Sequence, residues 1–280
     1  AEAAYFLGQR AYDSEEWEAA AGRYRLAAEK AAEKADEEAL REKSYYRLGW
    51  SLFKDEKYDE ARGAFSKQVD LAPDSRLAID GRMMVGECAF KSQKYQEALD
   101  AYALGREMIR SENDTAQSVR EPADRQVREL ILLHGGQSAA QLKRWDEAIG
   151  WYEELKQRFP STGYLAQLFY ETGFALQQKG DVTQAIQYFG QVAEKYRRRE
   201  IGARARFMLG EIYFGAKQYD KAIPEFQRVM LGFGGEDAPE AIKNWQAKSG
   251  FEAGRCSEQL MSSARTQDAK NRSRTFAIQF

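Results

Sequence analysis

One pattern of residues recurs along this chain, and it restricts the possible fold more than any other feature. An alanine stands twelve residues after each of six glycines, and an aromatic residue stands sixteen after each. Nine residues after the glycine, five copies have tryptophan or tyrosine and one has Val182. The glycines lie 41, 37, 50, 37 and 37 residues apart. They are Gly8, Gly49, Gly86, Gly136, Gly173 and Gly210.

The spacing within each copy is that of an α-helix. Offsets of nine, twelve and sixteen correspond to positions i, i+3 and i+7, which share one helical face. The glycine falls in a preceding helix, where its missing side chain lets a neighbouring helix approach. A short polar break such as residues 54–57 separates the two helices. Each copy therefore predicts a helical hairpin, and the hairpins bury their apolar faces by stacking.

Composition agrees with a helical chain and excludes some partners. Only five of the 280 residues are proline, and 31% are charged. The formal net charge is −2, which gives no overall attraction to nucleic acid or to anionic lipid. No apolar run reaches the length of a membrane span in this fragment. The sequence starts at Ala1 inside a helical pattern, so we expect a piece of a longer protein.

The small, alanine and aromatic positions resemble those of the tetratricopeptide repeat (TPR) family, over roughly residues 1–231. Pro73 and Pro160 also stand where that family often ends its second helix. The resemblance implies an all-α fold, a right-handed α-solenoid of six TPR-like hairpins plus a C-terminal capping helix, within a superhelical domain at 1–262. The hairpins are expected near 1–35, 37–72, 75–110, 122–159, 162–197 and 199–231.

The repeat length points to a narrower resemblance. The usual TPR period is about 34 residues, whereas 37 predominates here. Units of this length resemble those of bacterial envelope TPR proteins, of the outer-membrane-assembly lipoprotein or Tol–Pal coordinator type. That resemblance implies a location in the bacterial periplasm or in association with the outer membrane. A cytoplasmic location is the alternative.

Two segments depart from the pattern. The 50-residue interval holds a polar insertion at 111–124, which predicts a tolerated surface loop, an extended helix end or a binding loop. Residues 238–262 repeat the first-helix pattern, with Gly254 in the glycine place and no aromatic second helix after it. We expect this segment to be a capping helix. The basic tail at 263–280 predicts either a flexible linker or a segment docked in an aromatic groove, its own or a neighbouring copy's.

The sequence offers little for catalysis. The only histidine, His134, has no metal-ligand spacing around it, so a structural or solvated role is favoured. The glycine-rich stretch at 232–235 lacks the Lys-Ser/Thr of a phosphate loop. Cys88 and Cys256 occupy equivalent repeat positions and are expected to be free and buried. We therefore expect no enzyme, cofactor or metal site.

A basic run at 195–206 contains six cationic residues. It predicts either a site for an acidic partner or a membrane surface, or an ordinary solvated turn at a helix C-terminus.

By the resemblance, the first helix of each hairpin lines a concave surface. The positions three before, one after and four after the glycine would face it. Aromatic side chains dominate these positions and form the predicted partner-binding groove: Tyr5, Tyr46, Trp50, Phe53, Phe90, Tyr170, Phe174, Phe207 and Phe214. The alternative is that superhelical coiling buries part of these rings between adjacent first helices.

These observations predict a non-catalytic adaptor or scaffold that presents an aromatic groove to a peptide or helix of another protein. The alternative is an architectural spacer or a self-association module within a larger envelope protein. An apolar groove open to solvent would favour the adaptor, and a groove filled by neighbouring side chains would favour the spacer.

Overall fold

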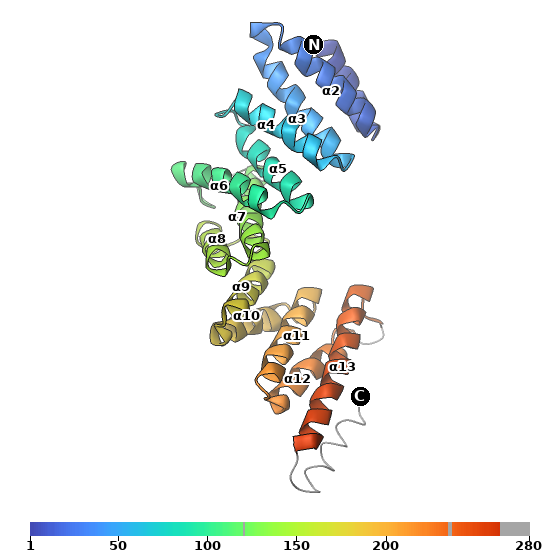
Figure 1. Cartoon of the computed structure of the whole chain (residues 1–280), viewed down its shortest axis with the longest axis vertical. Helices are drawn as coiled ribbons and strands as arrows, with labels where there is room; N and C mark the ends of the chain where they lie inside the picture. Colours follow the sequence, from blue (N-terminus) through green and yellow to red (C-terminus); the bar gives the residue numbers. More distant parts are fainter. Residues whose placement is uncertain (120, 235–236, 264–280) are drawn as a thin grey trace. The chain divides into compact units, whose positions relative to one another are not determined.

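The computed structural model describes residues 1–119, 121–234 and 237–263, and every regular element within these ranges is helical. The chain divides into two compact units, one formed by residues 1–162 and one that begins at Gly163 (Figure 1). Each unit is described on its own below. The all-α fold class expected from the repeat is confirmed.

The first unit consists of four hairpins. Their helices are α1 (Glu2–Asp13) and α2 (Trp17–Ala31), α3 (Glu38–Lys54) and α4 (Tyr58–Leu71), α5 (Ala78–Lys91) and α6 (Tyr95–Ser111), and α7 (Pro122–Gln141) and α8 (Trp145–Arg158). A short 3-10 helix, Ala35–Glu37, precedes α3.

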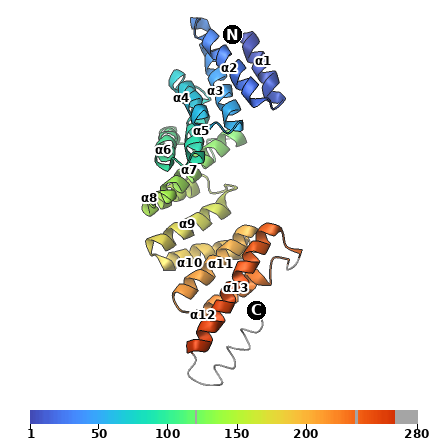
Figure 2. The same ribbon diagram turned by 45° about the vertical axis from the view of Figure 1, so that its right-hand side comes forward.

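The second unit contains two hairpins and one further helix. Its helices are α9 (Leu165–Lys179) and α10 (Val182–Lys195), α11 (Glu200–Gly215) and α12 (Tyr219–Met230), and α13 (Glu240–Ser263). Helix α13 packs against both α11 and α12, as two views show (Figures 1 and 2). Ala253 and Cys256 of α13 join a buried cluster with Phe226 of α12.

The repeat glycines are packing positions. A Cβ atom built on any of the six would lie between 2.3 and 3.1 Å from the ring of the aromatic residue sixteen positions later. All six of these aromatic rings are fully buried. Gly254 differs, because a Cβ there would meet nothing within 4 Å. The glycine-to-aromatic spacing in the sequence is therefore a direct contact between the two helices of one hairpin.

The turns inside the hairpins share one backbone conformation. Seven residues after each repeat glycine, the chain adopts a positive φ, at Glu15, Glu56, Gln93, Lys143, Gly180 and Lys217. The next residue donates its N–H to a carbonyl five residues earlier, as from Lys57 to Leu52 at 2.9 Å. This is the Schellman arrangement that closes helix C-termini. The second helix then begins at the residue nine after the glycine in all six hairpins.

Stacking of the hairpins follows one rule in both units. Within each unit, the second helix of one repeat packs against the first helix of the next, as α2 does on α3 and α10 on α11. First helices of neighbouring hairpins also contact each other, as α5 does with α7 and α11 with α13. The first helices therefore line the inner face of each unit.

The insertion forms the connection between α6 and α7. Helix α6 ends at Ser111 and α7 begins at Pro122, so the described residues between them, 112–119 and 121, form a loop, whereas Ser111 and residues 122–124 are helical. The backbone N–H of Ala116 donates to the carbonyl of Arg158 at 2.9 Å, which fastens the loop to the end of α8. No helix in the described ranges combines the length and apolar character that crossing a membrane requires.

Candidate protein-binding surfaces

The nine predicted groove residues all lie on first helices, but none of them is strongly exposed. Tyr170 is buried, with 7% of its surface accessible. The other eight are partly buried. Their positions on the first helices agree with the prediction, whereas a wide, open apolar surface is not present at these residues. Whether they bind a partner stays a prediction.

Ring contacts inside each hairpin account for this burial. The aromatic residue three before the glycine packs edge-on against the buried ring sixteen after it, as in Tyr46–Phe65 and Tyr170–Phe189. The aromatic residue four after the glycine packs against the first residue of the second helix. The pairs are Tyr12–Trp17, Phe53–Tyr58, Phe90–Tyr95 and Phe214–Tyr219, with centroids 5.0 to 5.5 Å apart. Much of the predicted groove is therefore filled by neighbouring side chains, which at these nine residues favours the spacer over the adaptor.

On the inner face of the first unit, partly buried carboxylates join neighbouring hairpins. The Tyr46 hydroxyl on α3 donates to the Asp80 carboxylate on α5. Burial raises the pKa of Asp80, and the Tyr46 hydrogen bond opposes that effect. Trp50 lies beside Tyr46 and Phe53, with its centroid 6.4 and 5.9 Å from theirs.

A second carboxylate, Glu87 on α5, holds two partners. Its Oε1 accepts a hydrogen bond from the Tyr102 hydroxyl at 2.6 Å and pairs with Nδ1 of His134 on α7. Burial alone would raise the pKa of Glu87, but the hydrogen bond and charge of His134, together with Tyr102, hold it below its ordinary value. Phe90 stacks on the His134 ring at 6.3 Å. The lone histidine thus has a structural place between two hairpins.

On the inner face of the second unit, arginines cover the rings instead. The guanidinium carbon of Arg204 lies 4.5 Å from the centroid of Tyr170 and 5.9 Å from that of Trp245. Phe207 packs against the same Trp245 at 5.3 Å. These cation–π contacts connect α9, α11 and α13. Phe174, on α9, is partly buried.

One part of this face remains open, and we call it the Arg255 surface: Glu211, Phe214, Phe251, Glu252 and Arg255. Phe251 is 68% exposed, the most open ring at any of the groove positions. The guanidinium carbon of Arg255 lies 4.8 Å from the Phe214 centroid and 5.9 Å from that of Phe251. Its Nη1 pairs with the Glu252 carboxylate at 2.8 Å.

Glu211 gives the Arg255 surface an unused acceptor. Its Oε1 is buried and has no hydrogen-bond partner among the described residues. Burial, followed by the nearby Glu252 charge, raises the pKa of Glu211 above its ordinary value. A buried carboxylate oxygen without a hydrogen-bond partner favours a ligand that brings a hydrogen-bond donor or a positive charge.

Sequence reasoning placed Phe251 in the groove register but did not select it as a site residue. The signal was available, because Phe251 stands three before Gly254, the same offset as Tyr170 from Gly173. Its exposure could not be read from the pattern. It follows from α13 being the last described helix, with no second helix packed behind Gly254.

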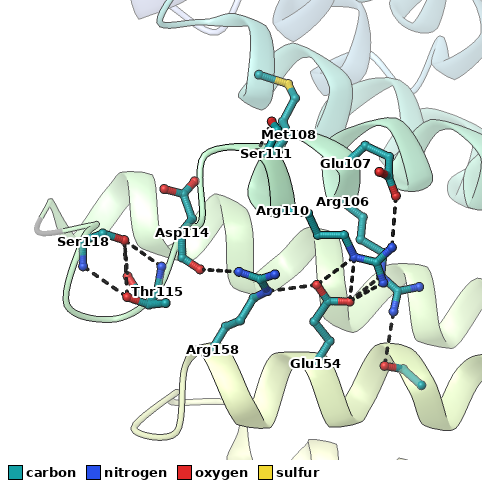
Figure 3. A network of polar contacts seen from close by, with 11 residues as sticks. Arg106, Glu107, Met108, Arg110, Ser111, Asp114, Thr115, Ser118, Glu154 and Arg158 are labelled. Atoms are coloured by element: carbon teal, nitrogen blue, oxygen red, sulfur yellow. Dashed lines mark hydrogen bonds and ion pairs between the residues drawn. The ribbon is translucent and has the colours of Figure 1, made fainter.

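The first unit carries a polar cluster on its second helices, away from the inner face. Figure 3 shows Arg106 and Arg110 of α6 and Arg158 of α8 converging on one carboxylate, Glu154. Nitrogens of the three arginines lie 2.7, 2.8 and 2.9 Å from it. Burial would raise the pKa of Glu154, but hydrogen bonds from these arginines lower it to about 2.

One arginine of this cluster also holds part of the insertion. Arg158 Nη1 also donates to the carbonyl of Asp114 at 3.1 Å (Figure 3). Arg128 of α7 pairs with the Asp114 carboxylate from the other side. The inserted loop is therefore held by an ion pair to α7 and by hydrogen bonds to the end of α8, a structural role that the sequence did not indicate. An open pocket of about 530 Å³ lies beside the cluster, but its arginines are already paired with Glu154.

The described residues contain no group of three side chains placed to hold a metal ion. Burial raises the pKa of both thiols, Cys88 and Cys256, to about 12, so neither is a nucleophile at neutral pH. Both cysteines are free and buried, as expected.

Comparison with known proteins agrees with the repeat. The tetratricopeptide repeat family profile matches residues 46–107 and 170–247, which together make up half of the chain. The chain belongs to the tetratricopeptide repeat family. A search of curated proteins finds no significant match.

Several solved structures share the fold. The C-terminal part of a TPR repeat-containing protein from Cytophaga hutchinsonii is 16% identical, with a TM-score of 0.62 over 98% of this chain and 94% of that one. A tetratricopeptide repeat protein from Parabacteroides merdae is 12% identical, with a TM-score of 0.61 over 99% and 98%. The MamA protein is 19% identical, with a TM-score of 0.54 over 70% and 92%. At these identities the likeness concerns the fold alone.

Proposed function

We propose that this chain is a non-catalytic adaptor that binds a peptide or helix of another protein on the inner face of its second unit, at the Arg255 surface. The observation that carries the proposal is the open Phe251 ring, 68% exposed, on the same surface as the buried Oε1 of Glu211, which has no hydrogen-bond partner among the described residues. An exposed aromatic next to an unsatisfied acceptor is the composition of an interface anchor.

The surface also defines the chemistry of its ligand. An apolar side chain would pack on Phe251 and Phe214, whose rings already contact the Arg255 guanidinium. A neighbouring lysine, arginine or backbone N–H would donate to Glu211. We therefore expect a segment with an apolar residue next to a hydrogen-bond donor, preferably a cationic one.

The experiment places a photo-crosslinking amino acid at position 251 and, as a control, at Leu104. Leu104 is 62% exposed and lies on α6, a second helix. Adaptor function predicts a discrete crosslinked partner from position 251 only. Binding of the purified partner should then weaken by about 2 kcal/mol in Phe251→Ala, and Leu104→Ala should bind like the unmodified chain. Equal affinity of the two variants would refute the proposed surface.

The same experiment separates the alternative role. Crosslinks from position 251 that join only two copies of this chain would favour a self-association module. Sedimentation velocity would then show a dimer whose population rises with protein concentration, and Phe251→Ala would abolish it.

A further inference from the structure

The turn between α10 and α11 concentrates positive charge. Four of the five residues at 195–199, the last residue of α10 and the four that link it to α11, are cationic: Lys195, Arg197, Arg198 and Arg199. All four side chains are exposed, and in the described part of the chain none of them forms an ion pair. Lys195 and Arg199 each lie over the ring of the fifth residue, Tyr196, at 5.7 and 5.8 Å.

The backbone of this turn is held in one conformation. The N–H of Tyr196 donates to Val192 at 2.9 Å, and the N–H of Arg199 donates to Tyr196 at 2.8 Å. A Cβ on Gly202 would lie 2.2 Å from the Tyr196 carbonyl oxygen, so only glycine lets α11 approach this closely. The turn therefore presents its cations from a fixed backbone.

The neighbouring acidic side chains are already engaged elsewhere. Glu194 and Glu225 pair with the buried Arg206 at 2.7 and 3.0 Å. The hydrogen bond with Arg206 lowers the pKa of Glu194, and Arg197 adds a smaller effect in the same direction. Glu200 accepts a hydrogen bond from Trp245 Nε1 at 3.4 Å. The hydrogen bond from a neutral indole does not offset the charge of Glu200, but the four cations still outnumber the carboxylates of Glu194 and Glu200 beside them, although the whole chain has a net charge of −2.

The turn is also hollowed. Residues 195–199 line a surface pocket of about 310 Å³, and within the described ranges no acidic residue contributes to its lining. We propose that this pocket binds an acidic segment of a partner protein, with aspartate or glutamate side chains paired to the arginines. A guanidinium matches a carboxylate in shape and charge, and a concave pocket admits a projecting side chain better than the flat surface of a bilayer. The site does not depend on the Arg255 surface, so either can fail alone.

The test measures binding of a fluorescein-labelled decapeptide of glutamate, with a decapeptide of glutamine as the neutral probe. The turn variant is Arg197→Gln/Arg198→Gln/Arg199→Gln. The matched control, Arg23→Gln/Lys30→Gln/Lys43→Gln, removes the same charge from exposed positions in the first unit. A third arm measures sedimentation with vesicles of phosphatidylcholine and 30% phosphatidylglycerol. Circular dichroism checks that both variants keep their helical content.

The proposal predicts that the glutamate peptide binds and the glutamine peptide does not. The turn variant should lose about tenfold in affinity, as expected for three partly screened ion pairs, and the control variant should change by less than about twofold. Affinity should fall as salt rises. Absence of peptide binding, or equal losses in the two variants, would overturn it. So would vesicle binding that depends on the three arginines when the peptide does not bind, because the ligand would then be a lipid surface.

Discussion

Glu87 and Glu211 occupy the same place in the repeat, one residue after the glycine of a first helix, and their environments are opposite. Glu87, in the first unit, accepts from Tyr102 and pairs with His134. Glu211, in the second unit, has a buried oxygen without a hydrogen-bond partner in the described part of the chain, and it lies near Glu252. The pKa of Glu87 is lowered and that of Glu211 is raised.

This difference separates two kinds of position in the repeat, those that make contacts inside a hairpin and those that make contacts between first helices. Contacts inside a hairpin, such as the glycine against the aromatic ring, are alike in both units. Contacts between first helices depend on which side chain the next hairpin supplies, His134 in one unit and Glu252 in the other. The shared positions specify the fold, and the variable ones give each inner face its own chemistry.

The largest expected effect concerns the shared contact. Gly49→Ala should destabilise the first unit by about 2 kcal/mol, because the new methyl group would lie 2.7 Å from the buried Phe65 ring. Gly254→Ala should be neutral or stabilise α13 by up to about 1 kcal/mol, since its Cβ meets nothing and alanine favours a helix. Thermal unfolding monitored by circular dichroism tests both. Similar losses in the two variants would mean that the aromatic contact does not set the requirement for glycine.

Much of the fold could be read from the sequence for the same reason. Glycine, alanine and aromatic residues at fixed offsets recur because each hairpin needs the same contact. The inner-face chemistry could not be read in this way. Glu87 and His134 are 47 residues apart and lie on the first helices of neighbouring hairpins. No spacing inside one repeat encodes that pairing. The exposed Phe251 and the tethered insertion likewise depend on what the adjacent segment supplies.

The second prediction removes the charge from the satisfied carboxylate. Glu87→Gln should destabilise the first unit by about 1.5 kcal/mol at pH 7, because His134 loses its ionised partner in a partly buried place. The pKa of Glu87 is lowered from 4.5 in the folded protein. The contribution of the Glu87 carboxylate to the free energy of unfolding is therefore fully present above 4.5 and is lost as the pH falls through the lower folded pKa. Hydrogen exchange of α5 and α7 peptides at pH 7 measures the local loss. Denaturant midpoints of the variant and the unmodified chain should converge in acid, and a constant difference between them would contradict the assignment.

The third prediction has the opposite sign. Glu211→Gln should stabilise the second unit by less than about 1 kcal/mol at pH 7, because it removes a charge that faces Glu252. The pKa of Glu211 is raised above 4.5, so the protonated group stabilises the fold below that value, and this stability is lost as the pH rises through the folded value. The stability of Glu211→Gln relative to the unmodified chain should therefore increase between pH 4 and pH 7. Destabilisation at pH 7 would show that Glu211 has a stabilising partner, and the contrast with Glu87 would fail.

The smallest expected effect concerns the residue seven after the repeat glycine, which has a positive φ in hairpins of both units. Residue 180 and residue 143 both stand seven after a repeat glycine, and their φ angles are 96° and 59°. The hairpin of α9 and α10, in the second unit, has Gly180 there, whereas the hairpin of α7 and α8, in the first unit, has Lys143 in a left-handed conformation that disfavours a side chain. Lys143→Gly should therefore stabilise the first unit by about 0.5 kcal/mol, the gain being limited by the greater flexibility of glycine in the unfolded chain. Gly180→Ala should destabilise the second unit by a similar amount, although a Cβ there would meet nothing within 4 Å. A gain in stability for Lys143→Gly and a loss for Gly180→Ala would identify backbone conformation as the cause, because neither change alters a side-chain contact of the inner face. If Gly180→Ala proved neutral, the turn would tolerate a side chain equally in both units, and the difference between Gly180 and Lys143 would have no energetic meaning.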